Sequence, residues 1–338
     1  MSRPCLLIIA AILSLLAPGP PAARAASPSS ERPAAPRAEP RSRAAGAQDI
    51  YCGAPITRSV TLAQDLSDCP GTGLNVGAFH TKGPSKITID LNGHSITGSR
   101  TKCCPGIIVV NSQRVTVKGP GTISGFDDCV RFQNDADRRG RGGHAVTGIT
   151  CRDSADDGIQ FIGNHGNRAV GNDIADVDGS GISLETSSNN RISGNRVSRA
   201  AKKLIEVGPD VLDFTAPGSH FNRISGNTLS DTDQVGVWIL GSFNNAISGN
   251  RISDARTSGI QVLGLSRGNL ISGNTIEGAA SARGIYTSPD AFGNRAEGNA
   301  IRRNSVTGNG TDLLDGSGRC ANTWKSNVFG TKDPDCIR

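Results

Sequence analysis

The chain has 338 residues, of which 20% are charged and only 4% aromatic, with 43 glycines and a formal net charge of +6. Residues 1–48 contain six Arg and two Glu and carry four of these net charges. The rest of the chain is therefore close to neutral, which removes the main support for nucleic-acid binding.

The N-terminus is typical of an exported protein. Residues 1–25 combine Arg3, an apolar run from Cys5 to Ala17 and the small residues Ala23 and Ala25, which is the pattern of a cleaved signal peptide. The apolar run is too short to span a membrane comfortably. Residues 26–48 are rich in Ala, Pro, Ser and Arg, so we expect a disordered linker. We expect a secreted, periplasmic or extracellular protein without membrane insertion.

A six-residue motif recurs in the C-terminal half. Asn-Arg-Ile-Ser-Gly-Asn occurs at 190–195 and 222–227, with variants at 245–250, 269–274 and 294–299 and a degenerate copy at 167–172. The closing asparagines are separated by 23, 32, 23, 24 and 25 residues. A repeat of this period predicts a solenoid.

Each period reads as about three short strands separated by turns, because apolar and polar residues alternate and Gly-Asn tolerates positive φ. Stacked periods should form inward columns. The first column is Ile159, Ile182, Ile205, Val237, Ile260 and Ile285; the second is Val170, Ile192, Ile224, Ile247 and Ile271; the third is Ile174, Val197, Leu229, Ile252, Ile276 and Ile301. The turn asparagines should stack as a hydrogen-bonded ladder, because an unpaired buried amide is costly.

Over residues 87–310 the chain resembles the right-handed parallel β-helix repeat proteins of the pectate-lyase-like superfamily. Ile87–Gly98 is also typical of how bacterial members begin. The resemblance implies an all-β, single-domain solenoid over residues 49–338, with an N-terminal cap at 49–86 and a C-terminal cap at 311–338. A leucine-rich repeat is excluded by the leucine spacing. The fold alone does not specify an activity.

Eight cysteines remain after signal cleavage, which suits an oxidising compartment. Local closure favours the pairs Cys52–Cys69 and Cys320–Cys336, each of which would staple one end of the solenoid. Cys103, Cys104, Cys129 and Cys151 should pair among themselves. The spacings of a metal cluster are absent.

The residue after each member of the first column should point outward. This outward row is Arg131, Gln160, Ser183, Glu206, Trp238, Gln261 and Tyr286. It contains one of the two Trp and one of the two Tyr of the chain, and aromatic faces stack on sugar rings. We therefore predict substrate binding by Trp238, Tyr286, Gln160 and Gln261, with His165 in the turn beyond. The alternative is that the aromatic side chains pack under a loop.

Two insertions, near 134–143 and 208–218, follow the strands of this row and would wall a groove, unless they are simply tolerated there. Asp127 and Asp128 lie in the turn that enters a strand of this row. Asp156 and Asp157 occupy the equivalent turn one coil later. Converging carboxylates can bind calcium or act as acid and base. The alternative is solvated turn aspartates.

Gly125–Val130 also resembles the Asp-Asp-Cys segment of polygalacturonases. The Gly-His-Gly element is only echoed at Gly143 and His144, and His144 aligns with a turn asparagine. The Arg-Ile-Lys element is absent, so the hydrolase mechanism is not carried over.

The sequence therefore predicts a monomer that acts on an anionic polysaccharide as a uronate lyase or C5-epimerase, in preference to a hydrolase. Arg131, Lys203 and calcium at Asp156 and Asp157 would neutralise the uronate carboxylate, Glu206 lies among them, and a basic side chain could abstract the C5 proton. Two alternatives stay open. One is a non-catalytic glycan-binding surface protein, and the other is a purely structural solenoid.

Overall fold

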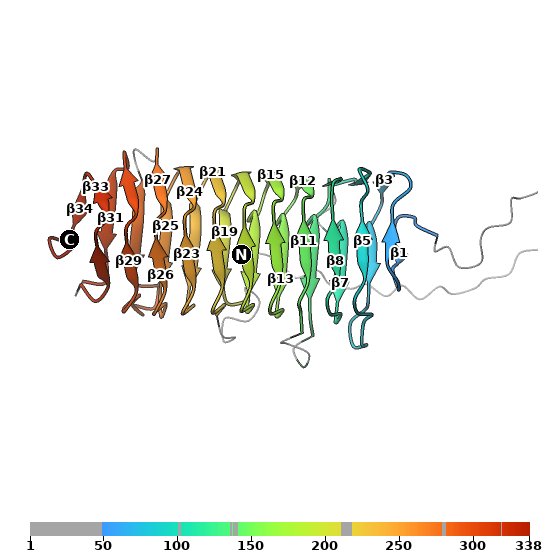
Figure 1. Ribbon diagram of the computed structural model, residues 1–338, viewed down its shortest axis with the longest axis horizontal. Helices are drawn as coiled ribbons and strands as arrows, with labels where there is room; N and C mark the ends of the chain where they lie inside the picture. Colours follow the sequence, from blue (N-terminus) through green and yellow to red (C-terminus); the bar gives the residue numbers. More distant parts are fainter. Residues whose placement is uncertain are drawn as a thin grey trace, which may run out of the picture. The chain divides into compact units, whose positions relative to one another are not determined.

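A computed structural model describes residues 49–100, 103–135, 137, 141–210, 218–278, 282–318 and 320–338. The predicted signal peptide and linker lie outside this part. The described residues form a solenoid built from strands without a helix, in which each coil contributes one strand to each of three parallel sheets (Figure 1). None of the described segments is a helix of the length and apolarity that a membrane crossing requires.

Sheet A has twelve strands: β1 (Ala54–Pro55), β4 (Leu74–Val76), β7 (Ile107–Val110), β10 (Val130–Gln133), β13 (Ile159–Ile162), β16 (Ile182–Glu185), β19 (Lys203–Gly208), β22 (Val235–Leu240), β25 (Ser258–Leu263), β28 (Arg283–Ser288), β31 (Thr311–Asp315) and β34 (Lys332–Asp333). Sheet B has eleven: β2 (Val60–Thr61), β5 (Thr88–Asp90), β8 (Thr116–Lys118), β11 (Ala145–Thr147), β14 (Arg168–Val170), β17 (Arg191–Ser193), β20 (Arg223–Ser225), β23 (Ala246–Ser248), β26 (Leu270–Ser272), β29 (Ala300–Arg302) and β32 (Thr323–Lys325). Sheet C has eleven: β3 (Leu66–Cys69), β6 (Ser95–Gly98), β9 (Thr122–Ser124), β12 (Thr150–Ser154), β15 (Asp173–Val177), β18 (Arg196–Ala200), β21 (Thr228–Thr232), β24 (Arg251–Ala255), β27 (Thr275–Glu277), β30 (Ser305–Thr307) and β33 (Val328–Phe329).

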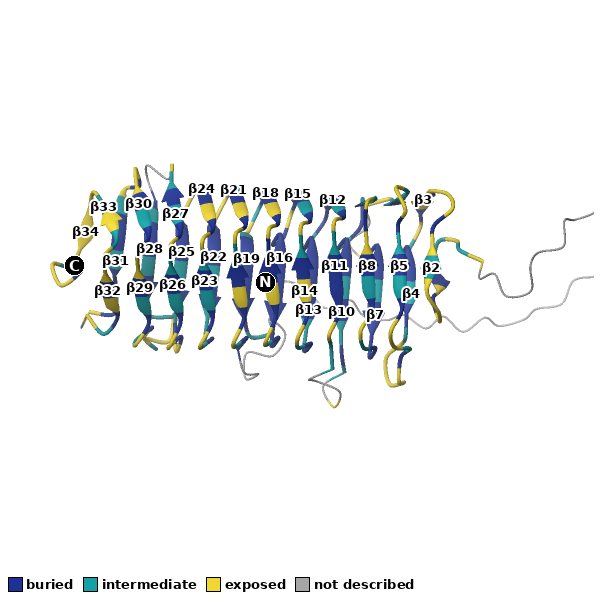
Figure 2. Cartoon of the chain, viewed as in Figure 1, coloured by how far each residue is buried: buried dark blue, intermediate teal, exposed yellow. Residues whose placement is uncertain are grey.

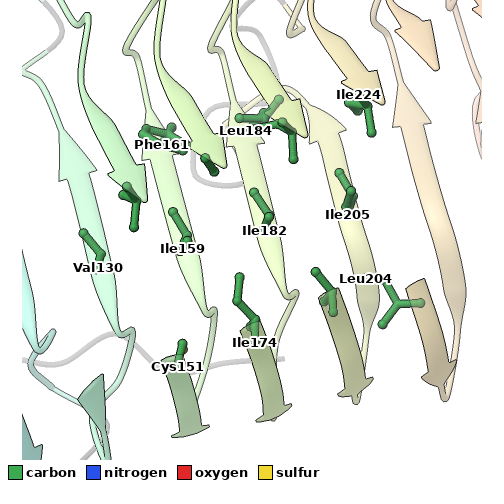
Figure 3. Packing of buried hydrophobic residues seen from close by; sticks show 14 of the residues in the cluster. Val130, Cys151, Ile159, Phe161, Ile174, Ile182, Leu184, Leu204, Ile205 and Ile224 are labelled. Carbon is green, nitrogen blue, oxygen red and sulfur yellow. The ribbon is translucent and has the colours of Figure 1, made fainter. Parts of the chain in front are cut away.

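The core is a set of apolar columns that run between the three sheets. Ile159 pairs in register with Ile182, and Ile182 with Ile205, and all three are fully buried. Figure 3 shows these side chains stacked from coil to coil. The first predicted column is confirmed as far as Ile285. Along each strand inward residues alternate with residues that face out, and Figure 2 shows the resulting mixture of buried and exposed positions.

The second and third predicted columns each contain one wrong residue. Ala169, and not Val170, pairs with Ile192, so the smaller side chain fills the inward slot. Val306, and not Ile301, continues the third column after Ile276, because Ile301 pairs with Ile271. Apolarity alone favours Val170 and Ile301, but the distance from the turn asparagine decides which side chain points inward.

The predicted asparagine ladder is present. The Asn250 side-chain amide donates to Oδ1 of Asn274 at 2.9 Å and accepts from the amide of Asn227 at 2.9 Å. A second ladder passes through Asn190, Asn222 and Asn245. These amides are almost fully buried, and each bond is made to the next coil, so the ladders hold the coils at a common spacing.

The last copy of the sequence motif was placed one strand too early. Asn274 donates its backbone N–H to Oδ1 of Asn304, which is 30 residues away, so the period after Asn274 is 30 and not 25. Asn299 instead continues the other ladder from Asn269. Residues 289–299 therefore form a long connection from sheet A to sheet B, as do the segments after β4, β10 and β19.

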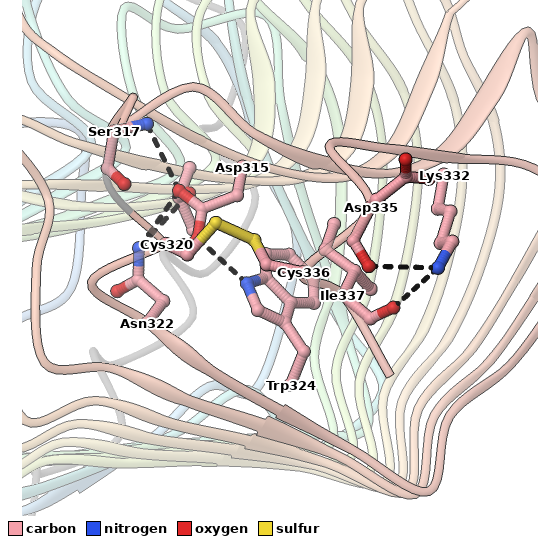
Figure 4. The surroundings of a disulfide bond; sticks show 10 residues. Asp315, Ser317, Cys320, Asn322, Trp324, Lys332, Asp335, Cys336 and Ile337 are labelled. Atoms are coloured by element: carbon pink, nitrogen blue, oxygen red, sulfur yellow. Dashed lines mark hydrogen bonds between the residues drawn. A yellow bond between two sulfur atoms is a disulfide. The ribbon is translucent and has the colours of Figure 1, made fainter.

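Disulfides close both ends of the solenoid. Cys52 pairs with Cys69 and Cys320 with Cys336, as predicted, and the remaining pairs are Cys103–Cys104 and Cys129–Cys151. At the C-terminal end the Cys320–Cys336 bond lies beside Trp324, whose indole N–H donates to Asp315 at 2.9 Å (Figure 4). The three sheets continue into both segments that were expected to be caps.

Candidate functional site

The outward face of sheet A carries the predicted row in register. Arg131 pairs with Gln160, Gln160 with Ser183, and Ser183 with Glu206; beyond Glu206 the pairing continues through Trp238, Gln261 and Tyr286. Neighbouring members lie one strand apart, about 4.8 Å. The row therefore brings a basic group, amides, a carboxylate and two aromatic rings onto one face of sheet A, on which Gln160, Ser183 and Glu206 are buried.

Glu206 is the best-supported carboxylate of the row. Its side chain is only 6% exposed. The Ser180 hydroxyl donates to Oε2 at 2.7 Å, and the Lys203 ammonium lies 3.1 Å from both carboxylate oxygens. Lys203 also lies 4.4 Å above the ring of Trp238, on the next strand. The structure thus joins Lys203, Glu206 and Trp238 in one cluster.

Glu185 was missed by the sequence interpretation. It lies on β16 two residues after Ser183, so it faces outward in a second row that the same alternation predicts. Its Oε1 accepts from the Gln160 amide at 2.9 Å and from the Ser183 hydroxyl at 3.0 Å. Burial raises the pKa of Glu185 to about 7, although the hydrogen bond from Gln160 opposes the shift.

Asp128 and Asp157 form a ladder of their own. Asp128 Oδ1 accepts the backbone N–H of Asp157 at 2.9 Å, and Asp157 Oδ1 accepts that of Ser180 at 2.6 Å. Burial raises the pKa of Asp128 to about 7 in spite of the charge of Arg131, and burial together with Asp128 raises the pKa of Asp157 well above its usual range. These two carboxylates position the strand ends beside Glu206.

The other two aspartates of the turn pair with basic residues. Arg131 lies 3.0 Å from Asp127 and also contacts Asp128, and Lys202 lies 3.0 Å from Asp156. Calcium needs six to eight oxygen ligands, and here a guanidinium already occupies the space between two carboxylates. Among the residues that the structure describes, no three His, Cys, Asp or Glu side chains are arranged to hold a metal. We therefore derive no chemical step through calcium.

The two aromatic side chains lean in opposite directions along the row. A Cβ on Gly208 would come within 3.1 Å of the Trp238 ring, and one on Gly316 within 3.0 Å of the Tyr286 ring. Gly208 precedes Trp238 by one coil and Gly316 follows Tyr286 by one coil. Both rings are half-buried, and Gln261 lies on the strand between them.

The predicted histidines lie in turns. His165 is half-buried, and its Nδ1 accepts the backbone N–H of Ser188 at 2.9 Å, so it belongs to the edge between sheets A and B and not to the outward row. His144 takes the expected asparagine position, since its backbone N–H donates to Asn167 Oδ1 at 3.0 Å. Burial lowers the pKa of His144 to about 4.

The inserted segments follow the strands of the row. The connections from β10 to β11 and from β19 to β20 both leave sheet A at the edge it shares with sheet B. Part of each falls at 136, 138–140 and 211–217, outside the described residues. Glu185 pairs with Gly208, the residue at which the second insertion begins, and Glu206 lies two residues earlier on the same strand. The acid Glu185 and the carboxylate Glu206 therefore both lie where this insertion leaves sheet A.

Two family models match the chain. The model described as "Right handed beta helix region" matches residues 77–210, and the one described as "Periplasmic copper-binding protein (NosD)" matches residues 214–332. The chain is a right-handed parallel β-helix protein. Its three parallel sheets and four disulfides agree with that family and with an oxidising compartment.

Solved structures show the same β-helix fold. The A-module of a mannuronan C-5 epimerase from Azotobacter vinelandii is 15% identical with a TM-score of 0.58, over 84% of this chain and 91% of that one. An alginate lyase from Paenibacillus is 16% identical with a TM-score of 0.57, over 82% and 96%. A DFA-IIIase from Arthrobacter chlorophenolicus is 14% identical with a TM-score of 0.56, over 79% and 74%. No curated protein sequence matches the chain.

The residues of this β-helix do not fit a copper site. Copper in proteins favours His, Cys and Met ligands. Within residues 214–332 the sequence has one histidine, His220, and one cysteine, Cys320, which forms a disulfide, while the single methionine of the chain is Met1. We therefore assign no copper chemistry to this chain.

Proposed function

We propose that this β-helix protein binds an anionic polysaccharide and modifies it as a uronate lyase or C5-epimerase. The observation that carries the proposal is the cluster of Glu206, Lys203 and Glu185 on the outward face of sheet A. It supplies a cation, a carboxylate and a carboxylic acid that is half-protonated near neutral pH. A glycoside hydrolase is the less favoured reading, because the hydrolase elements in the sequence are incomplete.

Cations of sheet A neutralise the substrate. The Arg131 guanidinium lies three strands away from Glu206, so it faces the carboxylate of a neighbouring sugar unit. The Lys203 ammonium, beside Glu206, lowers the charge of the reacting uronate carboxylate, which makes the C5 proton more acidic. Glu206 then accepts that proton, and the electron pair of the broken C5–H bond moves into the carboxylate as an enolate. Lys203 already lies within 3.1 Å of Glu206, so binding the substrate carboxylate and moving the proton take place at one point.

Glu185 completes either reaction as an acid. In elimination the C4–O bond breaks, the enolate electrons form the C4=C5 double bond, and the Glu185 proton goes to the leaving oxygen. In epimerisation Glu185 donates its own, solvent-exchangeable proton to C5 on the opposite face, Glu206 keeps the abstracted proton until it exchanges with water, and no glycosidic bond of the polymer is broken. Because Gln160 and Ser183 both bind Oε1, the proton of the acid resides on Oε2.

The remaining predicted site residues take supporting roles. Asp157 holds the backbone of Ser180, whose hydroxyl in turn holds Glu206, so Asp157 is a positioning residue. Asp156 plays the same part for Lys202. Trp238, Gln261 and Tyr286 extend the row by three strands and provide subsites for further sugar units.

Two further observations support the proposal. The solved structures with the same fold include proteins named as a mannuronan C-5 epimerase and an alginate lyase. Four disulfides and the signal-like N-terminus also fit a periplasmic or extracellular enzyme, where such polymers occur.

The experiment is a substrate panel of alginate, polygalacturonate and glycosaminoglycans, each incubated with and without calcium and with a chelator. Unsaturated chain ends report elimination, and the C5 configuration read by NMR reports epimerisation. Turnover of one polymer that depends on Glu206 supports the proposal. Binding without turnover would support the non-catalytic glycan-binding alternative, and neither binding nor turnover would contradict both.

A further inference from the structure

The outward face of sheet B carries an unusual distribution of charge. From β11 to β32 its strands contain five charged residues, all basic and all exposed: Arg168, Arg191, Arg223, Arg302 and Lys325. Figure 2 places these strands on the surface of the solenoid. Because the chain beyond residue 48 is close to neutral, such a face requires the acidic residues to lie elsewhere.

The acids gather at the edge between sheets C and A. A surface cavity of about 530 Å³ there is lined by five aspartates together with Arg100 and Arg199. In this cavity the arginines are paired: Arg199 lies 2.6 Å from Asp176, and Arg100 bonds Asp153 and Asp178. Basic residues on that side of the molecule are thus neutralised, in contrast to those of sheet B.

Three of the sheet B arginines stand in register. Arg168 pairs with Arg191, and Arg191 with Arg223, so their stems lie about 4.8 Å apart along the solenoid axis. Like charges directly opposite one another destabilise a sheet. Among the described residues no carboxylate forms an ion pair with any of the three, and the one side-chain partner is the Ser193 hydroxyl, 3.2 Å from Arg191. The guanidinium groups of these three arginines are therefore available to bind an external anion.

Hydroxyl groups line the same face. Ser193, Ser225, Ser248 and Ser272 form the next outward row in register. Serine hydroxyls donate to and accept from sugar hydroxyls and carboxylates. The described strands β14 to β26 have no aromatic side chain on this face, whereas single-stranded nucleic acid is usually held by aromatic stacking. The chemistry of the face favours a linear polymer of acidic sugars.

We propose that the outward face of sheet B, centred on Arg168, Arg191 and Arg223, is a second binding surface that holds an anionic polysaccharide along the solenoid axis. The ligand class is that of the proposed function, but the residues are different. The three arginines begin β14, β17 and β20, and the preceding sheet A strands of those coils, β13, β16 and β19, carry Gln160, Glu185 and Glu206. One long chain can therefore be retained on sheet B beside the site that modifies it.

The test compares two triple variants with the same loss of charge. In the first, Arg168, Arg191 and Arg223 are each replaced by Gln. In the control, Arg199, Arg251 and Arg256 are replaced by Gln; each of these is exposed and paired with an acid, Asp176, Glu277 or Asp233. Binding of long alginate and polygalacturonate chains is measured by titration calorimetry at several salt concentrations.

The sheet B triple variant should bind about tenfold more weakly than the wild type and with a smaller dependence on salt, while the control should bind almost as the wild type. Equal weakening in both variants, or no weakening in either, would overturn the proposal. If either triple variant unfolds, the single variants Arg191→Gln and Arg199→Gln provide the same comparison.

Two further measurements separate the possibilities. Single-stranded DNA that binds as tightly as the uronates, and loses affinity in parallel, would contradict the polysaccharide assignment. Turnover of short uronate oligomers should be unchanged in the sheet B triple variant, because they engage sheet A. Failure of the proposed enzymatic function would appear as absent turnover in every variant, with the difference in long-chain binding still present.

Discussion

The buried acid Glu185 should make the free energy of unfolding depend measurably on pH. Its pKa is raised from 4.5 to about 7 in the folded protein, mainly by burial. A raised carboxyl pKa stabilises the folded state below the unfolded value, and this contribution is lost as the pH rises through the folded value. The window runs from about pH 4.5 to about pH 7.

The size of the effect follows from the two pKa values. Relative to low pH, the linkage relation gives a loss of roughly 1 kcal/mol at pH 5 and roughly 3 kcal/mol at pH 8. Glu185→Gln keeps an oxygen that can accept from Gln160 and Ser183 and removes the ionisation. The free energy of unfolding of the variant should therefore fall roughly 2 kcal/mol less than that of the wild type between pH 5 and pH 8.

The assay is urea unfolding of both proteins at pH 5, 6, 7 and 8 at constant ionic strength. Asp128 and Asp157 are also buried and are present in both proteins. The charge of Glu185 is the smallest of the causes that raise the pKa of Asp157, after burial and its other acidic neighbours, so most of their contribution cancels in the difference. Glu277→Gln on β27 is the matched control, because Glu277 is only half-buried, with 40% of its side chain exposed, and pairs with Arg251. Parallel curves for wild type and Glu185→Gln would refute the burial argument, whereas divergence in the Glu277→Gln control would reveal a nonspecific charge effect.

Three other outcomes follow from the contacts. Trp238→Ala should weaken binding of the polymer about tenfold with unchanged thermal stability. In affinity electrophoresis, a variant that migrates like the wild type would contradict this expectation. Asn250→Ala should lower the free energy of unfolding by about 3 kcal/mol or more, since four ladder bonds lose a partner; a loss below 1 kcal/mol in urea titration would speak against the ladder. Replacing Cys129 and Cys151 by Ser should cost about 3 kcal/mol in the same titration, and an unchanged midpoint would show that this bond adds nothing.

Much of the solenoid could be predicted because one rule governs it. A period of 23 or 24 residues, with apolar residues two apart, determines which side chains face inward and therefore which face outward. The outward row from Gln160 to Tyr286 followed directly from this alternation. The two end disulfides followed from the short distance between their cysteines in sequence.

The wrong predictions lie where sequence similarity to the repeat motif does not coincide with the register of the backbone. Asn294–Asn299 resembles the motif, but residues 289–299 form a long connection, and the true coil continues to Asn304. Ala169 fills an inward slot that a neighbouring valine seemed to suit better. In both cases the position of the turn, which depends on the backbone bonds to the next coil, decided the register.

The candidate site was predicted only in part, because pairwise contacts across coils are absent from the sequence. The row contained Glu206, and Lys203 was predicted to neutralise the substrate, but nothing in the sequence indicated that Ser180 and Lys203 both bind Glu206. Glu185 was missed because only one outward position per strand was considered. The turn aspartates were predicted to bind calcium, to act as acid and base, or to be solvated, and none of these alternatives included the bond from Asp157 to the backbone of the following coil.

The central claim is that the cluster on sheet A removes the C5 proton of a uronate. The most direct test is proton NMR of alginate or polygalacturonate incubated with the protein in deuterium oxide, since both epimerisation and elimination abolish the C5 proton signal. We expect loss of this signal with the wild type, little or no loss with Glu206→Gln, and an unchanged fold in that variant. A C5 signal that persists with every polymer, or that disappears equally fast with Glu206→Gln, would contradict it.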